Sequence, residues 1–222
     1  MLYPVNEIFE TIQGEATFTG TPAVFIRLQG CPVGCGWCDT KHTWEVKEEK
    51  KVSSEIIFLK NSDSEDYASF STDEIINALK QYKATHIVLT GGEQCLYDLT
   101  ELTTELLNYG YAVQIETSGT HEIKADSRTW ITVSPKINMD GGFKVLKSCI
   151  LKADEIKHPV GKEKDVDLLI NLFKELNIDI ANQDIWLQPL SQNKKATQVC
   201  IQQATLNNWR ISVQTHKYID VR

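Results

Sequence analysis

Three cysteines lie within eight residues of one another and could hold a metal centre. Cys31, Cys35 and Cys38 have the spacing C-x3-C-x2-C, and no fourth cysteine follows nearby. A closed zinc site uses four protein ligands, whereas three thiolates on an iron-sulfur cluster leave one iron open to another ligand. The spacing leaves zinc open as an alternative, because His42 lies four positions after Cys38 and could complete a Cys3His site.

A second motif, a glycine-rich segment, favours an iron-sulfur cluster over zinc. Residues 23–28 form a short apolar run of strand type before the cysteines, and residues 86–89 form another before Thr90-Gly91-Gly92-Glu93. Paired glycines let a backbone approach a ligand closely, and the Glu93 carboxylate is an anionic acceptor. Reactive groups in α/β barrels lie at the carboxyl ends of strands, so we expect both segments to face one pocket.

These two motifs together resemble the radical S-adenosylmethionine (SAM) superfamily. The resemblance implies that the three cysteines bind a 4Fe-4S cluster. It also implies that the open iron chelates the amino and carboxylate groups of SAM, and that the Gly-Gly-Glu segment contacts the amino group. The order of the motifs, about sixty residues apart and each at a strand end, leads us to prefer the cluster to zinc.

Composition limits the other classes of function. The chain has 222 residues, 41% of them hydrophobic, which suits a single domain over residues 1–222 with a real core. The net charge is -7 and no basic block occurs, so we expect no direct nucleic-acid binding. There is no long apolar segment and no signal peptide, so we expect no membrane association. Six cysteines, three of them clustered, suit a reducing cytoplasm.

Alternating strands and helices must position these motifs. Short strands alternate with helical periodicity from residue 71 onward, which predicts an α/β fold with a barrel or partial barrel. The superfamily resemblance implies that this is a partial (β/α)6-type radical SAM barrel. Ser71 and Glu74 have the spacing of a capping box, and Gly110 is expected to end a helix. The expected strands are 7–12, 23–28, 86–89, 111–116, 130–133, 154–158, 184–188 and 210–214, and the later helices are 143–152, 165–176 and 196–208.

Residues 45–72 differ from the rest of the chain. Mixed charges and an acidic, serine-rich stretch flank a short apolar patch, residues 56–59. We interpret the segment as a partly mobile insertion that replaces or decorates the first crossover helix and could act as a lid.

Polar residues lie at the ends of several predicted strands. Capping a helix or solvating a loop would explain each one singly, but together they indicate a ligand pocket. They are Thr90, Glu116, Ser134, Lys136 and Gln188.

Arg27 is an unusual residue within an apolar strand. It could pair with a protein carboxylate or grip a substrate carboxylate, and the sequence leaves both open. Gln13 and Glu15 flank Gly14, which permits a tight bend that could bring both side chains to a ligand.

The match to one family extends nearly end to end. Gln13-Gly-Glu15, Cys38-Asp-Thr40, Glu116-Thr-Ser-Gly119, Ser134-Pro-Lys136, Gln188-Pro189 and Thr215-His-Lys217 resemble the 7-carboxy-7-deazaguanine synthase family. The resemblance implies conversion of 6-carboxy-5,6,7,8-tetrahydropterin to 7-carboxy-7-deazaguanine and ammonia. This is a radical ring contraction by a lyase of queuosine (7-deazapurine) biosynthesis, a tRNA modification pathway. It also implies a 4Fe-4S cluster, SAM, Mg2+, a flavodoxin or ferredoxin-type electron donor and a homodimer.

The resemblance also assigns roles by position. Cys31, Cys35 and Cys38 would ligate the cluster, and Thr40 would bind Mg2+. Residues that would hold SAM are Trp37, Cys38, Asp39, Gly92, Glu93, Ser134, Pro135, Lys136, Gln188 and Pro189. Residues that would bind the pterin are Ile12, Gln13, Gly14, Glu15, Arg27, Thr90, Glu116, His216 and Arg222.

Two positions depart from the family pattern. Gln94 follows Gly-Gly-Glu where proline is more usual, and Ala16 stands where glycine is usual after Gln-Gly-Glu. Alanine disfavours a positive φ, and glutamine lacks the fixed φ of proline. Two other functions stay open. Another small radical SAM enzyme, such as a glycyl-radical activase, would not need Arg27 or Thr40. A non-enzymatic zinc or iron-sulfur module would bind zinc with His42 as a ligand and would be indifferent to SAM.

Overall fold

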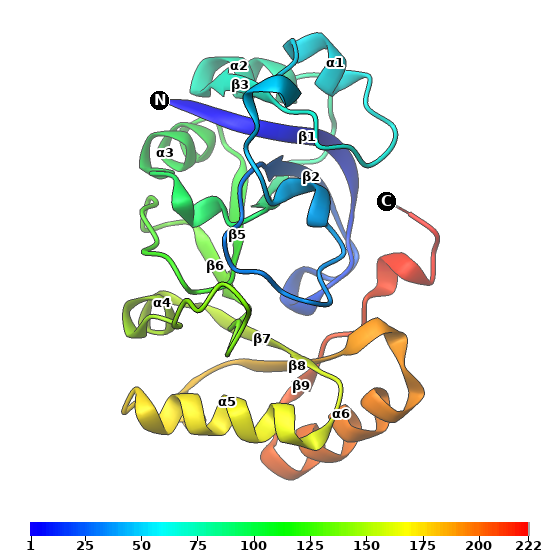
Figure 1. Ribbon diagram of the computed structural model, residues 1–222, viewed down its shortest axis with the longest axis vertical. Coiled ribbons are helices and arrows are strands. Elements are labelled where there is room, and N and C mark those ends of the chain that lie inside the picture. The colour runs from blue at the N-terminus through cyan, green and yellow to red at the C-terminus, as the bar shows by residue number, and fades with distance from the viewer. Residues whose placement is uncertain (222) are drawn as a thin grey trace.

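The computed structural model describes residues 1–221, built on a nine-stranded sheet with helices along its outer side (Figure 1). The strand order is β3-β1-β2-β4-β5-β6-β7-β8-β9, with β3 and β9 at the two edges. The strands are β1 Leu2–Gln13, β2 Thr21–Leu28, β3 Ala68–Ser71, β4 His86–Gly91, β5 Ala112–Thr117, β6 Trp130–Val133, β7 Glu155–Val160, β8 Ile185–Pro189 and β9 Arg210–Ile211.

The sheet is parallel from β2 through β9, and β1 runs antiparallel to both β2 and β3. The carboxyl ends of β2 and β4 to β8 therefore meet at one rim. The predicted α/β architecture is confirmed, because these six parallel strands form the partial barrel. The N-terminal hairpin of β1 and β2 and the short β9 extend the sheet on either side.

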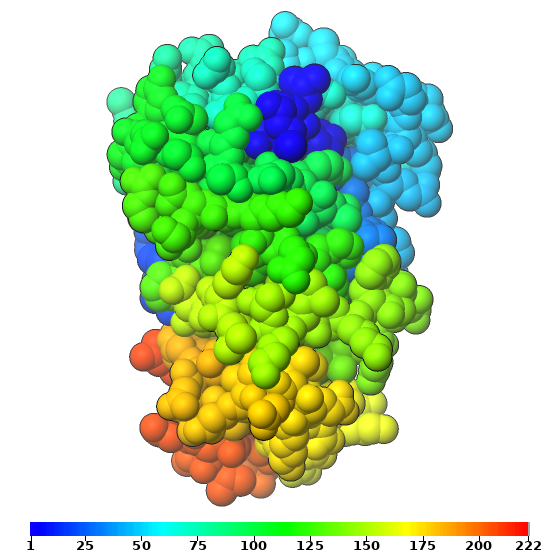
Figure 2. All heavy atoms as spheres, turned by 90° about the vertical axis from the view of Figure 1, so that its left-hand side faces the viewer, coloured from blue at the N-terminus to red at the C-terminus, as the bar shows by residue number. Residues whose placement is uncertain are grey.

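Six α-helices connect these strands in the described chain. Figure 2, which views the left-hand side of Figure 1, shows segments from cyan through green to orange covering this side of the molecule. No helix within residues 1–221 combines the length and apolar character needed to cross a bilayer. The helices are α1 Ser54–Phe58, α2 Thr72–Leu79, α3 Thr100–Asn108, α4 Lys147–Lys152, α5 Glu163–Glu175 and α6 Lys194–Asn207.

Local sequence explains where the helices begin and end. The Ser71 hydroxyl accepts the Glu74 N–H while the Glu74 carboxylate accepts the Ser71 N–H, which is the predicted capping box at α2. Gly110 follows α3 with φ of +91°, a conformation that favours glycine. The apolar faces pack on fully buried strand residues such as Ile26, Leu89 and Leu187 to form one core.

Two predicted boundaries are wrong for a tertiary reason. The helix expected from residue 143 begins at Lys147, because Leu146 is extended and its N–H bonds to the Gly119 carbonyl at 2.8 Å. The strand expected over 210–214 ends at Ile211, where the chain turns toward the loop after β1: the Ser212 hydroxyl accepts the Ala16 N–H at 2.9 Å.

The segment 45–72 does decorate the first crossover, but the prediction of a lid is wrong. Its last residues form β3, which pairs with β1 in the register Leu2↔Ser71 and Val5↔Ala68. Phe70 is buried there. None of the described side chains of this segment lines the cavity that holds the candidate site, so it extends the sheet edge instead.

Candidate active site

A cavity of about 370 Å³ opens at the carboxyl rim of the parallel strands. Its walls come from the cysteine loop after β2, the Gly-Gly-Glu loop after β4, the ends of β5 to β8 and the loop after β1. The site lies at the expected place for an α/β barrel. Most of the predicted site residues line it: Ile12, Gln13, Glu15, Arg27, Cys31, Cys35, Trp37, Cys38, Asp39, Thr40, Thr90, Gly92, Glu93, Glu116, Ser134, Lys136, Gln188, Pro189 and His216.

Among the described residues, two predicted site residues do not line the cavity, and a third falls outside that part of the chain. Gly14 backs it: a Cβ at Gly14 would lie 2.8 Å from the His216 backbone nitrogen, so glycine lets the C-terminal segment approach. Pro135 lies between two lining residues, Ser134 and Lys136. Arg222 lies outside the described residues.

The cysteine loop is held by its own backbone and by Trp44. The Cys38 N–H donates to the Cys35 carbonyl at 3.0 Å, and the Cys31 N–H donates to the Trp44 carbonyl at 2.8 Å. The Cys38 sulfur accepts from the Thr40 N–H and the Trp44 Nε1–H, each at 3.4 Å. Such donors stabilise a thiolate, which is the form that binds iron.

The donor set suits a cluster better than a single ion. Burial raises the pKa of Cys31 to about 11 and also raises that of Cys35, so a bound cation must compensate for their ionisation. Among residues 1–221, no three His, Cys, Asp or Glu side chains form a single-ion site. A 4Fe-4S cluster binds each thiolate at a different iron and needs no such convergence.

His42 does not join the thiols in this structure. Its Nε2 lies 4.0 Å from an Asp63 carboxylate oxygen, and the side chain does not line the cavity. The Cys3His arrangement is therefore not the one that the fold builds.

The Gly-Gly-Glu loop packs directly on the cysteine loop. The Gly92 N–H donates to the Leu28 carbonyl at 2.9 Å, and the Glu93 N–H donates to the Gly30 carbonyl at 2.7 Å. A Cβ at Gly92 would collide with the Gly30 carbonyl. Glycine is required here because the two backbones touch.

Glu93 is 1% exposed and receives several hydrogen bonds. Its carboxylate accepts from the Cys95 N–H at 3.1 Å, the Thr117 hydroxyl at 2.7 Å and the Ser118 N–H at 2.9 Å, as well as from the Ser118 hydroxyl. The Thr-Ser-Gly segment at the end of β5 thus fixes the carboxylate at the cavity wall.

Lys136 connects the end of β6 to the cysteine loop. Its ammonium donates to the Ser134 hydroxyl at 2.5 Å and lies 5.2 Å from the centre of the Trp37 ring. Burial lowers the pKa of this lysine, although the neighbouring Cys35 opposes the shift. The residues predicted to hold SAM therefore come together beside the thiols.

Arg27 takes part in the structural ion pair that the sequence left open. Its Nε lies 2.5 Å from Glu7 Oε1, yet the side chain also lines the cavity. The two interpretations are compatible, because the pair orients a guanidinium with further N–H donors.

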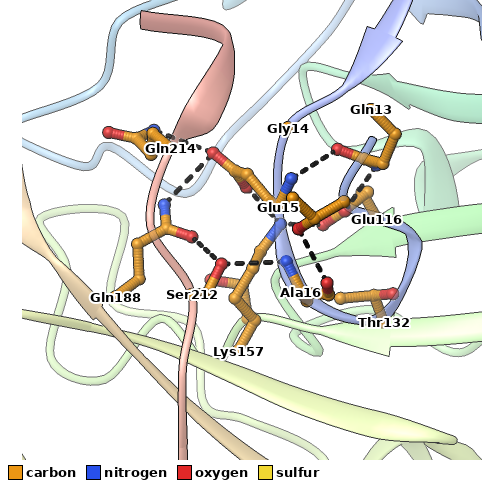
Figure 3. Close-up of polar contacts among 12 residues, drawn as sticks. Gln13, Gly14, Glu15, Ala16, Glu116, Thr132, Lys157, Gln188, Ser212 and Gln214 are labelled. Atoms are coloured by element: carbon orange, nitrogen blue, oxygen red, sulfur yellow. Dashed lines mark hydrogen bonds and ion pairs between the residues drawn. The ribbon is translucent and has the colours of Figure 1, made fainter. Parts of the chain in front are cut away.

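A lysine that sequence reasoning missed occupies the floor of the cavity. Lys157 Nζ lies 2.5 Å from Glu15 Oε2 and 2.6 Å from Glu116 Oε2 (Figure 3). Burial alone would raise the pKa of Glu15, but Lys157 and other donors lower it to about 2; burial raises the pKa of Glu116. The only signal in the sequence was a lysine inside the predicted strand 154–158, which also carries Asp154, Glu155 and His158.

Comparison with known proteins agrees with this geometry. Residues 25–180 match the Radical SAM superfamily model. The chain is 50% identical over 223 residues to the 7-carboxy-7-deazaguanine synthase of Escherichia coli K12, with 100% of both sequences covered. The chain belongs to the 7-carboxy-7-deazaguanine synthase family. The corresponding protein of Bacteroides thetaiotaomicron is 35% identical over 223 residues, again with both chains fully covered.

A solved structure of the family has the same fold. The crystal structure of QueE from Escherichia coli superposes with a TM-score of 0.92 at 50% identity, covering 96% of this chain and 94% of that one.

The two departures from the family pattern have visible consequences. Ala16 has φ of +51°, the strained conformation in which glycine is favoured. Gln94 is fully buried and donates from Nε2 to the Glu116 carbonyl, which joins the Gly-Gly-Glu loop to β5. In this member of the 7-carboxy-7-deazaguanine synthase family, a side-chain hydrogen bond from Gln94 therefore takes the place of the usual proline after the Gly-Gly-Glu segment.

Proposed function

We propose that this protein converts 6-carboxy-5,6,7,8-tetrahydropterin to 7-carboxy-7-deazaguanine and ammonia, as a radical SAM enzyme of queuosine biosynthesis. One observation carries the proposal: three thiols, the Gly-Gly-Glu loop and a polar floor face one cavity of about 370 Å³. Family membership at 50% identity over the full length supports the same reaction.

Cofactor binding falls to the residues of one wall. Cys31, Cys35 and Cys38 hold the cluster. The SAM residues are Trp37, Cys38, Asp39, Gly92, Glu93, Ser134, Pro135, Lys136, Gln188 and Pro189. The bound cluster and SAM supply a radical that removes hydrogen from a carbon of the substrate. The buried Glu93 carboxylate suits the amino group of SAM, since it is anionic and fixed by the loop after β5.

Substrate binding falls to the remaining residues around the cavity and at its floor. Arg27 pairs with the pterin carboxylate, and Thr40 offers a hydroxyl to Mg2+, an ion that prefers oxygen ligands and keeps several waters. Its Oγ1 lies 3.6 Å from the Cys38 sulfur. The heterocycle contacts Ile12, Gln13, Gly14, Glu15, Thr90, Glu116, His216 and Arg222.

The role of the chain is to orient one C–H bond and to exclude water. Partly enclosing the substrate between the cysteine loop and the C-terminal segment serves both purposes. The Thr215 N–H donates to the Gly14 carbonyl at 2.9 Å, which fixes that segment beside the cavity.

The proposal extends to partners and location. A flavodoxin or ferredoxin-type protein supplies electrons, and the exposed Trp37, at 43%, brings the cysteine loop to the surface where such a donor can approach. Six free cysteines suit a reducing cytoplasm. A homodimer, with no direct nucleic-acid partner, completes the assignment that the family resemblance implies.

The test is an oxygen-free assay of the protein reconstituted with iron and sulfide. Reductant, SAM, Mg2+ and 6-carboxytetrahydropterin are added, and 7-carboxy-7-deazaguanine is followed by mass. We expect product in excess of the SAM consumed. A brown protein that cleaves SAM without forming product would favour a glycyl-radical activase, and a colourless zinc protein would overturn the cofactor assignment.

A further inference from the structure

We propose that Glu15, Lys157 and Glu116 form an acceptor–donor–acceptor row that recognises the pterin edge carrying the 2-amino group, N1 and N8–H. Lys157 would then distinguish reduced pterins from the fully oxidised ring. The inference rests on the proposed function and deepens it by naming the groups that set substrate specificity.

The geometry of the three side chains carries the proposal. All three line the cavity, and the side chains of Glu15, Lys157 and Glu116 are 16%, 7% and 13% exposed. The Lys157 ammonium lies between the carboxylates, 2.5 Å from one Oε2 and 2.6 Å from the other (Figure 3). An ammonium has three N–H donors, and the carboxylates use two of them. The third is the donor at the centre of the row.

The far oxygens of both carboxylates are fixed by amides. Glu15 Oε1 accepts from Gln188 Nε2 at 3.2 Å and from Gln214 Nε2 at 2.8 Å. Glu116 Oε1 accepts from Gln114 Nε2 at 3.1 Å. The Oε2 atoms beside Lys157 are thus held in position, and each carboxylate oxygen has lone pairs for more than one donor.

A reduced pterin offers the complementary pattern. Its 2-amino group and N8–H are donors, and N1 between them is an acceptor. Neighbouring nitrogens that share a ring carbon lie about 2.3 Å apart, because each C–N bond is about 1.33 Å long. This spacing is close to that of the three protein atoms. The product keeps the same donor–acceptor–donor edge, since its pyrrole N–H replaces N8–H.

A fully oxidised pterin breaks the pattern at one end. Its N8 carries a lone pair and no hydrogen, so it would face a carboxylate oxygen as a second acceptor. A buried polar group left without its partner is costly, which is how sites built to bind an N–H reject analogues that lack it. Two adjacent carboxylates without the lysine would share a proton, and the protonated one could donate to N8.

The test compares two ligands that differ at N8. 6-Carboxy-7,8-dihydropterin has N8–H but no hydrogen on C6, so it binds without turnover, and 6-carboxypterin lacks N8–H. Their dissociation constants are measured by calorimetry without oxygen on the reconstituted, SAM-loaded protein with Mg2+. The variants are Lys157→Met and, as a matched control with the same loss of charge, Lys164→Met on the exposed face of α5.

We expect the wild type and Lys164→Met to prefer the dihydropterin by about 10- to 100-fold. In Lys157→Met we expect the affinity for the dihydropterin to fall, so that the dissociation constants of the two pterins differ by no more than about threefold. If Lys157 had a purely structural role, the variant would bind both pterins more weakly by the same factor. The ratio of the two dissociation constants would then stay as in the wild type, and that result would overturn the proposal. Should Lys157→Met fail to fold, Glu15→Gln and Glu116→Gln are measured instead. The amide that replaces the carboxylate facing N8 can donate to it, so a ratio unchanged in both variants also overturns the proposal.

Failure of this inference is distinguishable from failure of the proposed function. A wild type that forms 7-carboxy-7-deazaguanine but binds both pterins equally rejects only the recognition row. A wild type that binds neither pterin and forms no product rejects the function itself.

Discussion

Replacing Gly92 with alanine would force a methyl group into the contact between the Gly-Gly-Glu loop and the cysteine loop. A Cβ at Gly92 would lie 2.6 Å from the Gly30 carbonyl carbon and 3.2 Å from the Cys31 Cβ. Non-bonded carbons rest about 3.5 Å apart or more. One of the two loops must therefore move by about 1 Å, and Cys31 moves with it or loses its place beside the Gly-Gly-Glu loop.

The expected cost follows from the contacts that are lost. Overpacking a tight site costs about 1–3 kcal/mol. The hydrogen bond from the Glu93 N–H to the Gly30 carbonyl, 2.7 Å long, is worth about 1 kcal/mol. We expect Gly92→Ala to lower the free energy of unfolding by about 2–4 kcal/mol. A displacement of about 1 Å at a reacting centre costs about 100-fold in rate, so SAM cleavage should fall by about that factor.

Gly36→Ala is the matched control in the same cysteine loop. A Cβ at Gly36 meets no atom within 4 Å. Urea unfolding, iron content and SAM cleavage without substrate are measured for both variants, and Gly36→Ala should stay near the wild type. Wild-type unfolding free energy together with wild-type SAM cleavage in Gly92→Ala would refute the close packing of the two loops.

The remaining predictions concern four other side chains. His42→Ala should keep its iron content and cluster absorbance, and loss of the cluster would instead indicate that His42 is a metal ligand. Arg27→Ala should weaken pterin binding by about 10-fold or more while uncoupled SAM cleavage continues; unchanged pterin affinity would remove Arg27 from substrate binding. Thr40→Val should lose the response of turnover to added Mg2+, and an undiminished response argues against this ligand. Burial lowers the pKa of His158 from 6.5 to about 4. Its contribution to stability is therefore present above about pH 6.5 and lost as the pH falls toward 4, about 2 kcal/mol by pH 5. The free energy of unfolding is measured with urea at pH 7.5 and pH 5 for the wild type and for His158→Gln. Between these pH values the variant should lose about 2 kcal/mol less than the wild type, and equal losses would contradict the assignment.

The parts of the fold that sequence predicted are those set by local chemistry. The apolar run 130–133 predicted both ends of β6 correctly. The Ser71 and Glu74 pattern located the start of α2. Both depend on neighbours in the sequence, so no tertiary information was needed.

The failures came from contacts between distant residues. β3 lies in a charged segment and becomes a strand because it pairs with β1, where Leu2 meets Ser71. The short α4 begins late because Leu146 is bound to Gly119. Neither partner can be inferred from local periodicity.

The candidate site was predictable in its motifs and less so in its floor. Cysteine spacing and Gly-Gly-Glu have few alternative explanations, and the structure brings them to one cavity. Lys157 was missed because a single lysine in a strand usually points to solvent. Its role depends on Glu15 and Glu116, which are 142 and 41 positions away.

The most direct test of the central claim is the stoichiometry of a single oxygen-free reaction. Reconstituted protein is mixed with reductant, SAM, Mg2+ and 6-carboxytetrahydropterin, and product, ammonia and remaining SAM are measured in one sample. The proposed ring contraction predicts equal amounts of 7-carboxy-7-deazaguanine and ammonia with SAM recovered. Cleavage of SAM with neither product nor ammonia would contradict it.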